Sequence, residues 1–136
     1  MDISAHDLSL LGASLYLCEG TKERTLRRGG KVFAVEFTNT DSRTIKMFLR
    51  FLREIIEADE SRIKAELFIY SDLNESYLKK YWSNETKIPL ERFQKTIIFG
   101  QKTNVFRPSQ FGTIKIRYSH KEHFLKIKKM IDDIFD

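Results

Sequence analysis

The chain has 136 residues, of which 41% are apolar and 32% are charged, a balance typical of one globular domain rather than a disordered segment. Its single cysteine, Cys18, excludes an internal disulfide framework and a cysteine-based zinc cluster. No apolar run reaches the roughly 20 residues of a membrane span, and no basic signal-peptide start is present, so we expect a soluble cytoplasmic protein without a membrane partner. The net charge of +5 favours nucleic acid only where the basic residues cluster.

The first predicted element is a helix over residues 4–19. Its buried face should carry four residues spaced by three and four positions: Leu8, Leu11, Leu15 and Cys18. The same helix carries a second stripe, most of it small: Ser9, Gly12, Ala13 and Tyr16. Small side chains let backbones approach closely, so this stripe packs either against a second copy of the helix or under a neighbouring strand of the same chain. Gly20 follows as the stop signal.

A β-hairpin is predicted over residues 21–38, whose second arm alternates apolar residues with others. The pair Gly29-Gly30 favours a two-residue type I′ turn, in which both residues have positive φ. This segment is also the most basic of the chain, with one acid, Glu23, among five basic residues: Lys22, Arg24, Arg27, Arg28 and Lys31. The hairpin is therefore the first candidate for a nucleic-acid contact.

Helices and strands then alternate to the end of the chain. Further helices are predicted over residues 42–58, 73–82 and 120–135, with polar caps: Asp41 or Thr40, Asp72, and Ser119. Strands are predicted over residues 62–70, 96–99 and 113–118. No linker, repeat or low-complexity segment interrupts this order, so we predict a single domain over residues 1–136.

Residues 10–20, LLGASLYLCEG, resemble a diverged LAGLIDADG motif, with small residues at Ala13 and Ser14 and the terminal pair Glu19-Gly20. Three segments, SLYLCEGTK, VEFTNTDSRTIKMFLRFLRE and YLKKYWSNETKIPLERFQK, resemble the LAGLIDADG-like group of small bacterial and archaeal proteins. The resemblance extends over about residues 8–135. The sixth position of the motif is usually acidic in this family, but it is Leu17 here. Because that acid is generally more structural than catalytic, its absence affects the packing of the helix end more than the chemistry.

This resemblance implies an α+β fold, an αββαββα unit with a saddle-shaped antiparallel sheet and helices on one face. Because the chain holds one motif, it also implies a homodimer whose first helices pair through Ser9, Gly12, Ala13 and Tyr16. Double-stranded DNA would lie on the saddle. Glu19, the acid that ends the motif helix, would be the catalytic residue and the ligand of Mg²⁺; no small-molecule cofactor is implied.

The residues that carry this expectation also allow structural interpretations. Glu19 at the negative end of a helix dipole is disfavoured by about 0.3–1 kcal/mol, which a bound cation would reverse; alternatively it is a solvated end residue paired with Lys22. The basic hairpin can neutralise phosphates in a major groove, with Lys115 and Arg117 of a later strand extending the positive surface. Alternatively, its charges protect a solvated edge against aggregation.

We therefore expect a homodimeric double-stranded-DNA-binding protein of the LAGLIDADG type, with Mg²⁺-dependent site-specific endonuclease activity as its chemistry. One alternative is a non-catalytic DNA-binding or regulatory protein that retains the scaffold without cleavage. Another is an RNA-binding or protein-interaction module with a ferredoxin-like sheet. His120 and His123 lack a third ligand in the sequence and are interpreted as surface residues.

Overall fold

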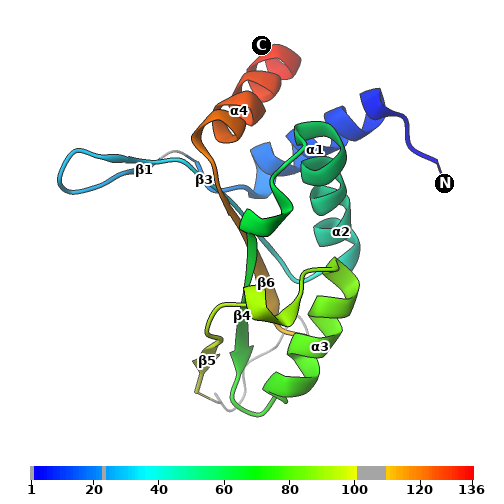
Figure 1. Ribbon diagram of the computed structural model, residues 1–136, viewed down its shortest axis with the longest axis vertical. Helices are drawn as coiled ribbons and strands as arrows, with labels where there is room; N and C mark the ends of the chain where they lie inside the picture. The colour runs from blue at the N-terminus through cyan, green and yellow to red at the C-terminus, as the bar shows by residue number, and fades with distance from the viewer. Residues whose placement is uncertain (1, 23, 101–109) are drawn as a thin grey trace.

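The computed structural model describes residues 2–22, 24–100 and 110–136, with only the backbone of Arg24 and Thr25, and it has an α+β fold (Figure 1). Within these residues the helices are α1 (Ala5–Glu19), α2 (Ser42–Phe51), α3 (Glu75–Thr86) and α4 (Lys121–Phe135). The strands are β1 (Arg24–Thr25), β2 (Lys31–Val32), β3 (Ala34–Asn39), β4 (Ile63–Tyr70), β5 (Ile97–Phe99) and β6 (Thr113–Ser119). Short helical turns are η1 (Leu52–Ile56), η2 (Glu60–Arg62) and η3 (Leu90–Arg92).

The main sheet has the strand order β3-β6-β4-β5. Strand β6 is antiparallel to both of its neighbours, and β5 is parallel to β4. The expected antiparallel sheet is therefore mixed, because α3 and η3 lie between β4 and β5 and return the chain in the same direction. Strands β1 and β2 pair only with each other and form a separate two-stranded ribbon.

One side of the sheet packs against helices and forms the hydrophobic core. Strand β4 buries every second residue, as its alternation predicts: Ile63, Ala65, Leu67 and Ile69. On β3, Phe37 stacks on Phe48 of α2 with ring centroids 4.3 Å apart. Helices α2 and α3 lie along this side, and the β1–β2 hairpin extends away on the opposite side (Figure 1).

The buried face of α1 differs from the predicted one. Leu11 and Cys18 are exposed, whereas Gly12, Ala13 and Tyr16 are buried within the chain. A Cβ atom on Gly12 would lie 2.0 Å from the ring of Phe51, so glycine is required for the close approach of α1 to α2. The expected dimer interface is therefore wrong for these three residues, because their own chain covers them.

Ser9, the remaining residue of the expected interface, is half-buried. Its hydroxyl donates to the carbonyl of Ala5 at 2.8 Å, a hydrogen bond within the helix. The small stripe as a whole thus serves packing within one chain, the alternative that the sequence left open.

The hairpin turn is also different from the expected two-residue type I′ turn. Gly29 has φ of 88°, but Gly30 does not have positive φ. The Gly29 amide donates to the Leu26 carbonyl and the Leu26 amide donates to the Gly30 carbonyl. These bonds define a three-residue loop, Arg27-Arg28-Gly29, in which a single residue needs the left-handed region.

The helix ends confirm one predicted cap and correct two others. Asp41 caps α2 by accepting from the Arg43 amide, as expected, and hydrogen bonds from Arg43 lower the pKa of Asp41 to about 2. Asn74 rather than Asp72 caps α3, and His120 rather than Ser119 caps α4 through Nδ1. The expected helix over residues 42–58 changes to π-helical geometry at η1 before it ends.

Candidate nucleic-acid interface

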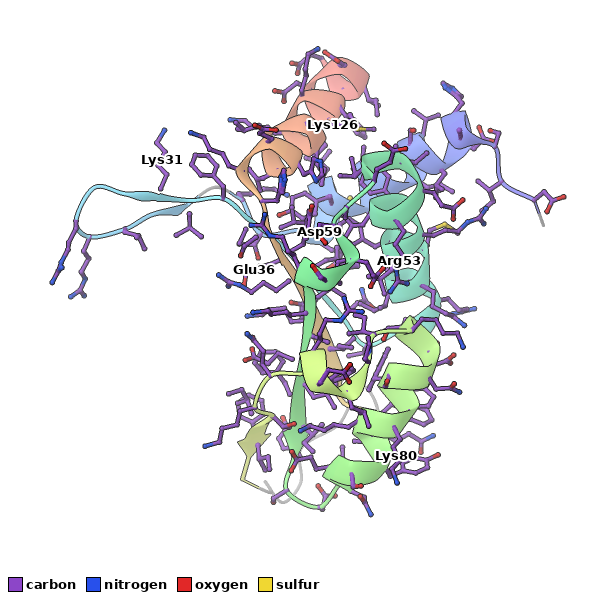
Figure 2. All side chains as sticks on the ribbon, viewed as in Figure 1. Lys31, Glu36, Arg53, Asp59, Lys80 and Lys126 are labelled. Carbon is purple, nitrogen blue, oxygen red and sulfur yellow. The ribbon has the colours of Figure 1, made fainter. Side chains whose placement is uncertain are left out.

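The β1–β2 hairpin projects from the body of the protein (Figure 1), and basic residues lie at and near its tip in the sequence. Arg27, Arg28 and Lys31 are exposed, and Lys31 is labelled in Figure 2. The sequence between residues 24 and 35 contains no acid. Among the described residues, no carboxylate pairs with either arginine of the tip. The hairpin is therefore a positively charged ribbon whose width suits a DNA major groove.

Arg24, the remaining predicted contact of the first arm, lies in β1 opposite Val32. Its backbone belongs to the ribbon, and its side chain lies outside the described part of the protein. The prediction for this side chain therefore stays a prediction.

Lys22 has a structural role that replaces the expected DNA contact. Its ammonium donates to the carbonyls of Tyr16, Leu17 and Gly20 at 2.9, 2.8 and 3.1 Å. The same Nζ lies 5.3 Å from the centroid of the Tyr16 ring. All three donors of the ammonium are thus directed to the carboxyl end of α1, where a positive charge offsets the helix dipole.

Lys115 and Arg117 lie on the side of the sheet that faces away from α2, but they do not form a purely basic surface. Arg117 Nη1 donates to Glu36 Oε2 at 2.8 Å, and Lys115 Nζ lies 3.7 Å from the same oxygen. Lys115 Nζ also lies 3.8 Å from Oε1 of Glu66. Glu36 is only 2% exposed, so its charge requires these partners. The strand register that brings them together is not visible in the sequence.

Glu19 is exposed as the last residue of α1. The described residues offer its carboxylate no hydrogen-bond or ion-pair partner, and the expected pair with Lys22 is not formed. They also contain no group of three side chains able to hold a metal ion. Since Mg²⁺ takes one or two protein carboxylates with water and phosphate oxygens, a single Glu19 per chain fits part of such a shell, and two copies would supply two.

The outer face of α1 contains two residues, Leu11 and Cys18, that were predicted to be buried but are exposed. Leu10, Leu11 and Leu17 are 36%, 42% and 37% exposed, and Cys18 beside them is also exposed. These residues follow helical spacing along one side of α1. Half-buried Ser14 lies within the same stripe. We call this stripe, residues 10, 11, 14, 17 and 18, the outer face of α1.

His120 and His123 form a half-buried cluster at the start of α4, not a solvated pair. Their rings stack with centroids 3.8 Å apart, and the Tyr118 hydroxyl lies 2.7 Å from His123 Nδ1. Burial, together with the nearby charges of His120 and Lys126, lowers the pKa of His123. The Nδ1 of His120 accepts from the His123 amide, and the Nδ1 of His123 is paired with the Tyr118 hydroxyl, so the cluster has a packing and capping role.

Comparisons of the chain with models of known protein families, with curated proteins and with solved structures find no match. Across the described residues, no helix combines the length and the apolar character needed to cross a membrane.

Proposed function

We propose that this protein binds double-stranded DNA as a homodimer of the LAGLIDADG type. The observation that carries the proposal is the projecting hairpin, whose tip presents Arg27 and Arg28 with no acid nearby in the sequence between residues 24 and 35. Phosphate neutralisation by such side chains supplies most of the sequence-independent affinity of DNA-binding proteins. The hairpin extends away from α2 and α3 (Figure 1), and the side of the sheet that carries Lys115 and Arg117 is opposite the buried side of β6.

The order of the elements supports the LAGLIDADG-type assignment. The first helix is followed by a hairpin whose second arm continues from β2 into β3, and then by α2. Strands β4 and β6 form the next antiparallel pair, and α4 ends the chain. If β2 and β3 are counted as one strand, and α3 and β5 as an insertion between β4 and β6, the remaining elements have the order αββαββα.

The outer face of α1 supports the homodimer. A helix that is apolar on all sides is stable in water only when both of its sides are covered. The chain covers the side with Gly12 and leaves three leucines exposed on the other side. A second copy packed on this face would bury the leucines and place the two Glu19 ends of α1 in the same region.

Replacing Leu11 by glutamate is expected to weaken the homodimer by about 10-fold or more, because each copy loses the burial of a leucine that is 42% exposed, which is about 40% of the roughly 1.5–3 kcal/mol for a whole side chain. The dimer constant is measured by sedimentation equilibrium, with Leu90→Glu as the control because Leu90 has a similar exposed fraction, 46%, but lies on η3. A bismaleimide should cross-link wild-type dimers through Cys18, the single cysteine. A monomer at tens of micromolar would contradict the dimer.

Cleavage is the part of the proposal that depends on Glu19. The Glu19 carboxylates of two copies would hold Mg²⁺, which would supply Lewis-acid chemistry for phosphodiester hydrolysis when bound. Glu19 would hold the ion through its charged carboxylate, and replacing Glu19 by glutamine would remove that charge.

Glu19→Gln is expected to lower Mg²⁺-dependent cleavage of a randomised duplex library by at least about 100-fold, since a catalytic metal contributes several kcal/mol. Binding of the duplex should be unchanged. Glu91→Gln, an exposed acid on η3, is the matched control. Wild-type protein that binds duplexes tightly but cuts none of them would favour the non-catalytic DNA-binding protein.

A further inference from the structure

A polar depression of about 340 Å³ opens where β4 begins and β6 ends. Six side chains line it, and none of them is acidic or apolar: Ser61, Arg62, Lys64, Gln94, Arg117 and Ser119. Three of the six are cationic, and of these only Arg117 was predicted from the sequence to contact DNA. We call this depression the Arg62–Lys64–Arg117 pocket.

The strand register places two like charges directly opposite each other in this pocket. Lys64 of β4 pairs with Arg117 of β6, so their side chains stand on the same side of the sheet. Arg62 immediately precedes β4 and donates to the carbonyl of Ser119 at the end of β6. Like charges opposite each other in a sheet are destabilising, and an anion bound between them would remove that cost.

The acids around the pocket are already engaged with other partners. Asp59 accepts from the Ser61 hydroxyl at 2.7 Å, and Glu60 pairs with Arg53 and Arg92 at 2.7 and 3.1 Å. Glu36, on the far side of Arg117, accepts from its Nη1. Within the described residues, Lys64 is exposed and forms no ion pair. The pocket therefore keeps an excess of positive charge.

The charge of Arg62 is a secondary influence on two neighbouring titratable groups. The Ser61 hydroxyl, more than any other group, lowers the pKa of Asp59, and the charges of Arg62 and His120 act in the same direction. Arg62 also contributes to the lowered pKa of His123. Lys126 of α4, labelled in Figure 2, adds to the field at His123.

The pocket lies at the root of the hairpin. Ser119 pairs with Ala34, the first residue of β3, and the His120 amide donates to the carbonyl of Phe33 between β2 and β3. A nucleic-acid strand that contacts the tip arginines and runs back along the ribbon would therefore reach this pocket.

We propose that the Arg62–Lys64–Arg117 pocket binds a phosphate group, and that in the DNA complex it holds one backbone phosphodiester at the root of the hairpin. Guanidinium groups match the geometry of phosphate oxygens, and an ammonium adds a third point charge. The side chains of Ser119 and Gln94 supply neutral donors at the rim. The second part of the proposal depends on the DNA-binding function proposed above, whereas the first part does not.

The first experiment is an NMR titration of the protein with inorganic phosphate. The amides of residues 61–64 and 117–119 should shift saturably, and Lys64→Ala should weaken the binding several-fold. Lys80→Ala, which removes an exposed lysine of α3 far from the hairpin, should leave the titration unchanged (Figure 2). If the amide shifts are absent or do not saturate, the proposal that the pocket binds phosphate is wrong.

The second experiment measures duplex affinity against salt for the same variants. Lys64→Ala should reduce the slope of log affinity against log salt by about 1, and Lys80→Ala should not change it. If the pocket binds phosphate but Lys64→Ala leaves the slope of log affinity against log salt unchanged, the pocket does not contact DNA. Phosphate binding by wild-type protein that binds no duplex would support the pocket, as a site for free phosphate, and contradict the proposed function instead.

Discussion

Replacing Arg27 and Arg28 together by alanine is expected to lower the affinity for double-stranded DNA about 30-fold at 0.15 M salt. Each lost phosphate contact removes about 0.9 from the slope of log affinity against log salt, which is roughly fivefold per contact at this concentration. Both side chains are exposed at the hairpin tip, and Gly29, which the turn requires, is kept. The fold should therefore be unaffected, and the loss should be equal for all duplex sequences if both residues contact phosphate.

The measurement is a series of fluorescence-anisotropy titrations from low to high salt. The matched control is Lys80→Ala with Lys129→Ala, which lowers the net charge by the same amount at exposed sites of α3 and α4. Equal losses in the two double variants would mean that net charge alone attracts DNA, and the hairpin assignment would fail. Tighter binding of single-stranded or duplex RNA by wild-type protein would favour the RNA-binding alternative.

Gly12→Ala is expected to destabilise the protein by about 2–3 kcal/mol, although alanine favours a helix by up to about 1 kcal/mol. The added Cβ would lie 2.0 Å from the ring of Phe51, which ends α2 and is fully buried. Neither the ring nor the helix can move without opening the core, so the steric cost exceeds the gain in helix propensity. The free energy of unfolding is measured by urea denaturation.

Ser9→Ala is the control for this substitution, because Ser9 lies on the same helix and already has a Cβ atom. Its unfolding free energy should change by no more than about 0.5 kcal/mol. A Gly12→Ala variant as stable as wild type would mean that α1 and α2 pack less closely than the structure has them. It would then restore the small stripe as a candidate contact between two chains.

Several elements could be predicted because their signals are local. The alternation of Ile63, Ala65, Leu67 and Ile69 predicts a strand with one buried face, and β4 has that face. Asp41 precedes a strongly amphipathic segment and caps it. In both cases the residues that give the signal lie within a few positions of the strand or helix end that they predict.

The candidate site depended on contacts that a single sequence does not reveal. Lys115 and Arg117 were expected to be a free positive surface, but the register of β6 with β3 sets Arg117 opposite Glu36. Lys22 was expected to bind DNA, but the chain turns after Gly20 so that its ammonium reaches the end of α1. The Arg62–Lys64–Arg117 pocket was missed because Arg117 lies far from Arg62 and Lys64 in the sequence, and only the pairing of β4 with β6 brings them together.

The sequence by itself determined that a helix lies over about residues 4–19, that a basic hairpin follows and that helices and strands then alternate. Only the tertiary structure decided which side of the first helix is buried. That helix is apolar on all sides, so its periodicity selects no face, and Gly12 marks the buried side only through its contact with Phe51. Helical period is a property of neighbouring residues, whereas the choice of a face depends on the shape of the helix that packs against it.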